Sequence, residues 1–157
     1  MKSLILIFVT IFAVSCIEEN KASDGKGNDV RAIRDGNLNG VVAGKAWDFI
    51  KGRVAPSRNF PNEHTFDFWD EDISNECDPF TFGGDRNIMG VFPLKVGTIN
   101  LNNTNSLTFY YNNNNLVTSE GKIEILEITD SYVGGKLKAR FDSNNYVEGE
   151  FRLEICQ

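Results

Sequence analysis

Hydrophobic and charged residues alternate with a period of two along the last quarter of the chain. The apolar positions are Leu137, Ala139 and Phe141 in a first stretch and Val147, Gly149, Phe151, Leu153 and Ile155 in a second. The residues between them are charged. Because successive side chains of a β-strand point to opposite faces, this pattern predicts two strands with one buried and one solvated face.

Shorter apolar runs, separated by Gly, Asn and Asp, continue the pattern back to Asn39, and no ten-residue stretch shows a helical period. We predict strands at 41–43, 46–55, 65–69, 88–92, 107–111, 116–119, 122–128, 133–141 and 146–155. Many short strands with regular turns are typical of an all-β domain. We expect one such domain over residues 38–157, either a single antiparallel β-sandwich or a partly open β-barrel.

The turns between the last three predicted strands set the expected pairing. A turn centred on Asn144 places Leu137 opposite Phe151, and the preceding turn places Ile125 opposite Leu137. Charged residues then pair across the solvated face, where each pair contributes a few tenths of a kcal/mol. Their main effect is on the register, since a slip of one residue would bury the charges.

The chain begins with features of an export signal. Lys2 precedes an apolar run of eleven residues, 4–14, which is shorter than the roughly 20 residues that span a bilayer and fits the core of a signal peptide. The segment Ala13-Val14-Ser15-Cys16 resembles the bacterial lipobox, with Ala13 where that pattern usually has Leu. The resemblance implies that residues 1–15 are a lipoprotein signal peptide and that Cys16 becomes the lipid-bearing first residue. An ordinary signal peptide cut elsewhere is the alternative.

Residues 16–37 are expected to connect the lipid to the domain as a flexible linker. They are rich in Asn, Asp, Gly and Lys, and such a stretch buries too little apolar surface to fold. The Cys-Ile-Glu-Glu start lacks Asp at its second position, so the inner-membrane retention signal of many lipoproteins is missing. It also resembles the acidic surface-export tag of some of them. We therefore expect an outer-membrane location, on the periplasmic face or at the cell surface.

Negative charge is concentrated in one segment. The formal net charge is −6, and residues 63–78 hold seven Asp and Glu without any Lys or Arg. No basic patch is visible, which disfavours nucleic-acid binding. Clustered carboxylates are calcium ligands, but the run from Asp70 lacks the Gly that a calcium loop has at its sixth position, and Thr81 stands where that loop has Glu. Calcium is thus a possible ligand, a solvated acidic loop is the alternative, and no other cofactor is expected.

The cysteine count predicts a disulfide. With Cys16 assigned to the lipid, Cys77 and Cys156 remain, and an even pair in an exported chain most simply forms a bond. Two free thiols are the alternative. The bond would close a loop of about 80 residues, worth roughly 4.5 kcal/mol in the chain-entropy model. It would tie the acidic segment to the last strand.

Four segments resemble small exported bacterial lipoproteins of unknown function: Gly40–Trp47, Phe92–Thr98, Glu120–Ile125 and Gly149–Cys156. The resemblance covers about residues 38–157 and implies a single β-rich domain with no established active site. It carries no catalytic residue over to this chain. The only histidine, His64, has no accompanying Gly-x-Ser-x-Gly motif, and we expect a non-enzymatic protein.

The acidic segment is also the predicted binding surface, with the candidate residues His64, Asp67, Trp69, Asp70 and Asp72. If Phe66 and Phe68 point inward, Trp69 points outward. An exposed indole beside carboxylates is suited to anchor a partner or to stack on a sugar. The alternative is that Trp69 packs beneath the loop over 70–80.

Two classes of function remain open. The first is a lipid-anchored protein-interaction module, accessory or immunity-type, that binds another envelope or secreted protein. The second is a surface lipoprotein that binds a glycan or a small ligand on its β scaffold. If the acidic segment is not the binding surface, the next candidate is the predicted hairpin loop Asn112–Asn115 with its neighbours Tyr110 and Tyr111.

Overall fold

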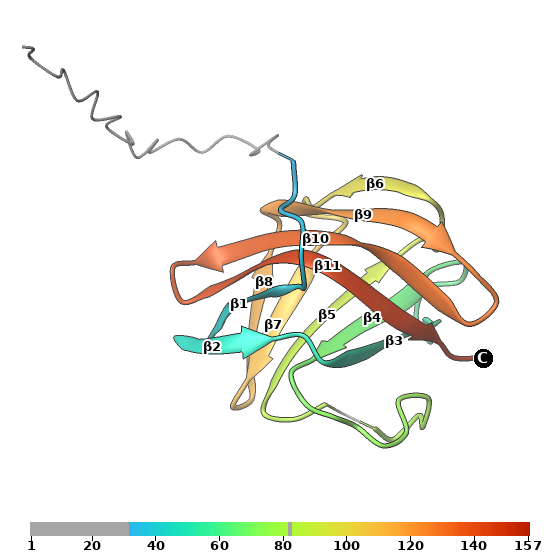
Figure 1. Cartoon of the computed structure of the whole chain (residues 1–157), viewed down its shortest axis with the longest axis horizontal. Coiled ribbons are helices and arrows are strands. Elements are labelled where there is room, and N and C mark those ends of the chain that lie inside the picture. The colour runs from blue at the N-terminus through green and yellow to red at the C-terminus, as the bar shows by residue number, and fades with distance from the viewer. Residues whose placement is uncertain (1–31, 82) are drawn as a thin grey trace, which may run out of the picture.

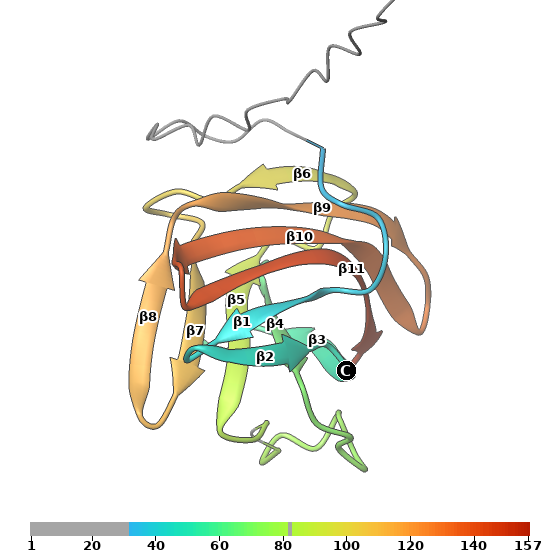
Figure 2. The ribbon, with the colours of Figure 1, turned by 60° about the vertical axis from the view of Figure 1, so that its left-hand side comes forward.

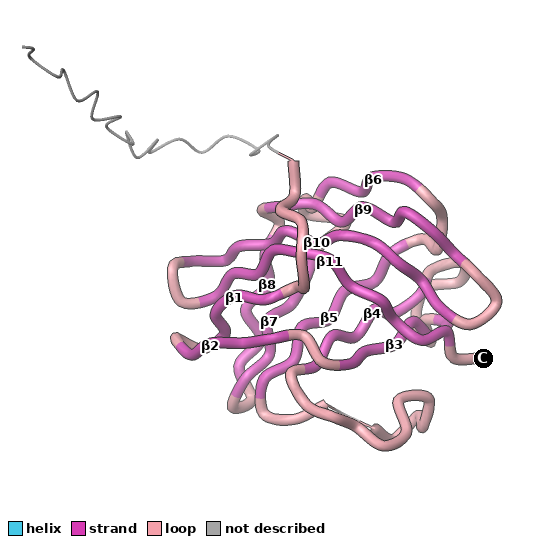
Figure 3. Tube along the Cα trace, viewed as in Figure 1, coloured by secondary structure: helices cyan, strands magenta, loops and turns pink. Residues whose placement is uncertain are grey.

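The computed structural model describes residues 32–81 and 83–157, and all regular secondary structure in them is β-strand (Figure 1, Figure 3). The eleven strands are β1 (Asn39–Val42), β2 (Lys45–Asp48), β3 (Lys51–Pro56), β4 (His64–Trp69), β5 (Arg86–Phe92), β6 (Gly97–Asn100), β7 (Leu107–Tyr111), β8 (Asn114–Thr118), β9 (Gly121–Ile128), β10 (Tyr132–Asp142) and β11 (Asn145–Ile155). The predicted all-β class is confirmed. The described part of the chain contains no helix with the length and hydropathy of a membrane span.

The strands form one sheet that curls over on itself into a half-barrel, as Figure 2 shows. The order is β6-β9-β10-β11-β3-β4-β5-β7-β8, and the β1–β2 hairpin pairs with β11 beside this path. β8 returns toward β10 at one end, where Thr118 Oγ1 donates a hydrogen bond to Arg140 O and Arg140 N donates to Glu120 O at 3.1 Å. This architecture agrees with the predicted sandwich or partly open barrel.

The core lies between the two arms of the curled sheet, which are β6-β9-β10-β11 and β3-β4-β5-β7-β8. Phe66 and Phe68 on β4 are fully buried, as their alternation predicts, and so is Leu137 on β10. The rings of Phe68 and Phe151 meet edge to face with centroids 5.3 Å apart, a favoured aromatic geometry. The apolar inner face of one arm is therefore packed directly on that of the other.

The predicted pairing of the last two strands is wrong by two residues. Leu137 pairs with Gly149 instead of the residue two positions further on. The cause is a tighter turn: Asp142 Oδ1 accepts hydrogen bonds from Asn144 N at 2.8 Å and from Asn145 Nδ2 at 2.9 Å. Because side chains alternate with a period of two, this slip keeps the predicted faces while changing every cross-strand partner.

The pairing predicted between β9 and β10 is also wrong by two residues, since Ile125 pairs with Gly135. The register of these strands shifts between Gly134 and Gly135, and such a β-bulge has no signal in the alternation. A second irregularity, in the β10–β11 ladder, lies at Phe141. Phe141 is 44% exposed, although the alternation places it on the buried face.

The single strand predicted over 46–55 is two strands, β2 and β3. At the break, Phe49 N donates to Leu38 O at 3.0 Å and Ile50 N donates to Trp69 O at 2.9 Å. The chain thus leaves β1 and joins β4 within two residues. β6 is missing from the prediction because only one of its four residues has a large apolar side chain; it pairs with the outer edge of β9.

The folded domain begins before the predicted boundary at residue 38. Ile33 is only 4% exposed, and Gly36 O accepts a hydrogen bond from Glu150 N at 2.7 Å. Residues 33–37, predicted as the end of the linker, therefore form a strap along β11. The strap is ordered because its backbone and its one large apolar residue find partners there.

Three predictions concern residues outside the described part of the chain. These are the signal peptide over 1–15, the lipid-bearing Cys16 and the linker as far as residue 31. They stay predictions from the sequence.

The strap lies directly against β11 at Gly149. A Cβ atom at Gly149, which has φ of +144°, would lie 2.6 Å from Asn37 O and 2.7 Å from Leu38 Cα. Gly97 has a similar φ of +141°, but nothing lies within 4 Å of its Cβ position. A side chain would strain the backbone at either glycine. Only at Gly149 would it also collide with neighbouring atoms.

Gly149→Ala is therefore expected to destabilise the protein more than Gly97→Ala. Both substitutions force a side chain onto a conformation that costs about 1–3 kcal/mol, and only the first also pushes the strap away from β11. Urea unfolding of the two variants measures the difference. Equal losses of unfolding free energy would show that the strap is not seated against β11 in solution.

Candidate functional site

Two of the predicted binding residues, Asp67 and Trp69, lie on the outer face of β4, and Asp70 and Asp72 follow in the connection to β5. Residues that point away from the core form a cross-strand row of Arg53, Asp67 and Met89. The connection between β4 and β5, residues 70–85, folds back over part of this face (Figure 1). We call this connection the clamp loop, and residues 57–63 between β3 and β4 the hairpin loop.

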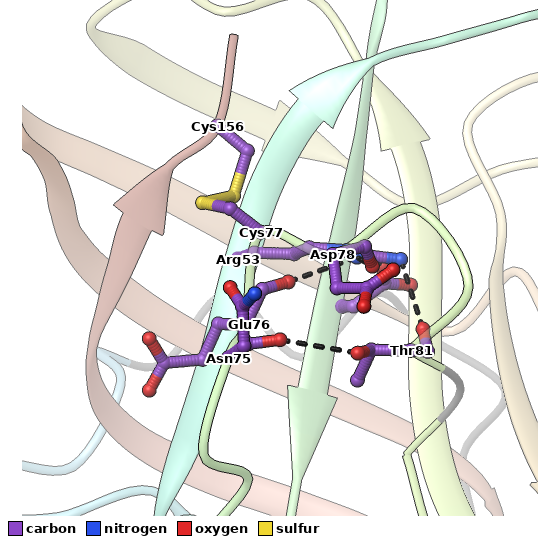
Figure 4. The surroundings of a disulfide bond; sticks show 8 residues. Arg53, Asn75, Glu76, Cys77, Asp78, Thr81 and Cys156 are labelled. Carbon is purple, nitrogen blue, oxygen red and sulfur yellow. Dashed lines mark hydrogen bonds and ion pairs between the residues drawn. A yellow bond between two sulfur atoms is a disulfide. The ribbon is translucent and has the colours of Figure 1, made fainter.

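Arg53 is the centre of the contacts that hold the clamp loop. Its Nε donates to Asp67 Oδ2 at 2.9 Å. Its terminal nitrogens donate to three clamp-loop carbonyls, those of Glu76 at 2.8 Å, Asp78 at 2.7 Å and Thr81 at 3.2 Å (Figure 4). The side chain is 13% exposed, and such a charge is stable in the interior only when its donors are satisfied in this way.

Two further cations neutralise the acidic residues of the clamp loop. Lys51 Nζ lies 2.9 Å from Asp72 Oδ1 and 3.0 Å from Glu76 Oε1, and it donates to the carbonyl of Ile73 at 2.9 Å. Arg86 forms an ion pair with Asp70. The cations come from β3 and β5, so the loop is bound to the strands on both sides of β4.

This pairing neutralises the three carboxylates of the predicted binding surface. Asp67, Asp70 and Asp72 each face an internal cation, and Asp67 and Asp70 are nearly inaccessible to solvent, with side chains 9% and 8% exposed. Only the Asp72 side chain is well exposed, at 79%. Asp70, Asp72 and Glu76 therefore attach the clamp loop to the sheet through their ion pairs.

Burial raises the pKa of the Asp67 carboxyl above its ordinary value, although the Arg53 guanidinium acts in the opposite direction. Burial raises the pKa of Asp70 as well, against its attraction to Arg86. In both cases the loss of hydration outweighs the ion pair. The neighbouring cations lower both pKa values and so partly offset the effect of burial.

The predicted disulfide is present and joins Cys77 of the clamp loop to Cys156 after β11 (Figure 4). Its cysteines are 79 residues apart in sequence, with Cα atoms at 5.2 Å. Cys156 N donates to Val54 O at 2.8 Å, which sets the bond beside Arg53. The covalent link and the guanidinium therefore hold the same part of the loop.

The idea of an exposed Trp69 is wrong. The residue points to the outer face, as the alternation predicts, but it is only 2% exposed. Gly83 of the clamp loop lies against its ring, and the Arg53 guanidinium carbon lies 5.4 Å from the ring centroid. The alternative, in which the indole packs beneath the loop, describes the structure.

His64 begins β4, beside the hairpin loop, and is separated from the ion pairs of the clamp loop. Its Nδ1 is buried and has no hydrogen-bond partner among the described residues. Over 32–81 and 83–157, no three His, Cys, Asp or Glu side chains are placed to hold a metal ion. Asp70 and Asp72 face different cations, so the calcium hypothesis gains no ligand set from this arrangement.

A groove of about 630 Å³ opens on the outer face between the two loops. Its lining includes Ala55, Phe60, Thr65, Pro79, Met89 and Val91. A hollow of about 280 Å³ continues it past Phe60 over β5 and β7. Phe60 is 54% exposed and Met89 40%, and Phe80 on the neighbouring clamp loop is 81% exposed. We call the two connected hollows the outer groove.

The hairpin loop presents Phe60 in a defined position. Ser57 N donates to Glu63 O at 2.9 Å, and Phe60 N donates to Ser57 Oγ at 3.3 Å. Neither Phe60 nor Met89 is among the functional candidates predicted from the sequence. The signal for Phe60 in the sequence is its position as a large aromatic residue among the polar residues of 57–63. Met89 has no such signal, because it lies in an ordinary strand pattern.

No family model, no curated protein and no solved structure matches this chain. The resemblance to small bacterial lipoproteins therefore stays a prediction from the sequence.

Arg53→Met is expected to lower the unfolding free energy by about 3–5 kcal/mol, because it leaves a buried carboxylate and three loop carbonyls without their donor. Asp67→Leu should cost less, since Arg53 keeps its three carbonyl partners. In the double variant the losses should not add. Urea unfolding of the four proteins gives the coupling energy.

Arg152→Met is the control for this cycle, because Arg152 is exposed and lies over the ring of Tyr132 at 3.5 Å. Loss of an exposed cation–π contact is expected to cost about 0.5–1 kcal/mol. If Arg53→Met costs no more than this control, the guanidinium does not hold the clamp loop.

Cys77→Ser/Cys156→Ser is expected to lower the unfolding free energy by about 2–4.5 kcal/mol, since it releases a long closed loop in the unfolded chain. Reduction of the wild-type protein should have the same effect. The measurement is urea unfolding with and without reductant, accompanied by thiol alkylation. Quantitative labelling of both cysteines in freshly isolated, non-reduced protein would contradict the bond.

Proposed function

We propose that this protein is a non-enzymatic, lipid-anchored protein of the outer membrane that binds another envelope or secreted protein in the outer groove. The anchor is inferred from the lipobox-like segment that ends at Cys16. The observation that carries the binding function is the pair of exposed phenylalanines, Phe60 and Phe80, on the two loops that flank the groove.

Exposed aromatic rings beside a hollow are suited to anchor a protein partner. Phe60 lies between the two hollows of the groove and Phe80 on the opposite loop. Large aromatic side chains dominate the binding energy of many interfaces when a partner excludes water from them. Met89 on the floor adds an adaptable apolar contact.

The attachment of the loops reduces the entropy that a partner must overcome. The clamp loop is fixed by Arg53 and by the Cys77–Cys156 bond, and the hairpin loop is closed by hydrogen bonds of its own. A surface that is already ordered loses little freedom on binding. The two hollows of the groove are continuous past Phe60, which gives room for a segment of a partner chain.

A photo-reactive amino acid at position 60 or 80 of the full-length chain, irradiated in its own membranes, is expected to give one discrete protein adduct. The same probe at Leu126, which is 56% exposed on β9, is the control. Phe60→Ser and Phe80→Ser should then weaken binding of the purified partner by about tenfold or more, the effect of losing an anchor residue. Identical adducts at all three positions, or unchanged affinity in both variants, would refute this function.

A further inference from the structure

A third hollow lies on the outer face beside the clamp loop. It adjoins the outer groove at Gly83, Asn87 and Met89, and its lining is richer in amides. It has a volume of about 630 Å³, within the range of small-molecule sites. Its polar lining consists of Asp85, Asn87, Tyr110, Asn112, Asn113 and Asn115. We call it the amide hollow, because four of these six side chains are primary amides.

The amide hollow is built on three adjacent strands. Asn87 of β5 pairs with Tyr110 of β7, which pairs with Asn115 of β8. The three side chains therefore stand side by side on one face of the sheet. Asp85, immediately before β5, completes the lining from the clamp loop.

The β7–β8 turn holds the remaining two amides in place. Asn112 and Asn113 have φ of 46° and 63°, the conformation of a two-residue hairpin turn in which asparagine is favoured. Tyr110 Oη donates to Asn113 Oδ1 at 2.9 Å. The bond leaves the Asn113 NH₂ group available to a ligand and fixes the Tyr110 hydroxyl.

Asn87 is oriented by the clamp loop. Its Nδ2 donates to Gly83 O at 3.0 Å, and its buried Oδ1 has no partner in the described residues. A Cβ atom at Gly83 would lie 2.6 Å from that oxygen. The absence of a side chain at residue 83 thus allows the loop to approach the sheet and border the hollow.

We propose that the amide hollow binds a neutral carbohydrate. A primary amide carries both a hydrogen-bond donor and an acceptor. It can therefore pair with a sugar hydroxyl, which also donates and accepts. The Asp85 carboxylate adds a strong acceptor for hydroxyl donors, and the half-buried Tyr110 offers an aromatic surface for the C–H face of a sugar ring. This assignment is independent of the partner proposed for the outer groove.

The charge of the lining argues against the other classes of small ligand. No Lys, Arg or His is among the described residues that border the hollow, so phosphate or carboxylate ligands would meet Asp85 without a compensating cation. A purely apolar ligand would leave the amides without hydrogen bonds, which is costly. A neutral, hydroxyl-rich ligand needs no cation in the lining and can form hydrogen bonds with the amides.

The test is a titration of the ¹⁵N-labelled full-length chain, in a sugar-free zwitterionic detergent, with glucose, galactose, mannose and N-acetylglucosamine. Concentrations extend to about 50 mM, above the millimolar dissociation constants of weak single sites. At least one sugar is expected to shift the side-chain amide signals of Asn87, Asn113 and Asn115 saturably. Triglycine, a neutral peptide, is titrated in parallel and should leave them unchanged.

Asn115→Ala and Asp85→Asn should each weaken sugar binding about tenfold or more, and Tyr110→Ala should abolish it. If Tyr110→Ala does not fold, Tyr110→Phe, which retains the ring, is measured in its place. The matched control is Asn114→Ala, one residue away on the same strand and outside the hollow. The proposal is overturned if no sugar shifts these amides, if triglycine shifts them equally, or if sugar affinity is the same in all variants.

Discussion

The outer face of this protein depends on one buried guanidinium. Arg53 converges on a carboxylate and three backbone carbonyls that would otherwise be left without donors as the clamp loop folds onto the sheet. A planar group with five fixed N–H donors can satisfy such a set, whereas a lysine ammonium offers a single point. The charge and the loop stabilise each other, because neither is tolerated in the interior without its partner. The loop therefore has one position on the sheet, and the hollows on either side of it have fixed walls.

The position of the acidic segment on the sheet also depends on Arg53. Seven Asp and Glu in a stretch without cations would repel one another in an isolated loop. In the fold, β3 and β5 supply Lys51, Arg53 and Arg86 to four of these carboxylates. The Cys77–Cys156 bond adds a covalent attachment at the same place. Four of the seven carboxylates that look like a binding signal in the sequence are thus paired internally, whereas Phe60, Met89 and Phe80 remain exposed.

The sequence predicts what depends on neighbours in the chain and misses what depends on distant ones. The period-two alternation correctly assigns Phe66, Phe68 and Leu137 to the core, and the even cysteine pair correctly predicts the disulfide. The strand registers are wrong by two residues because turn closure by Asp142 and the bulge at Gly134–Gly135 change the pairing without altering the faces. The burial of Trp69 follows from a loop that returns over it, a contact that no local pattern contains.

The candidate sites are hidden from sequence reasoning for the same reason. Phe60 of the hairpin loop borders one hollow together with Met89 and Val91 of β5, and the amides of the other come from β5, β8 and the turn between β7 and β8. The clamp loop passes over Trp69 at Gly83. This glycine borders both the outer groove and the amide hollow. A side chain at residue 83 would meet both the indole and Asn87, so the loop could not approach the sheet as closely. The outer groove and the amide hollow therefore meet at a contact that requires glycine, and Arg53 and the disulfide hold the loop that makes this contact.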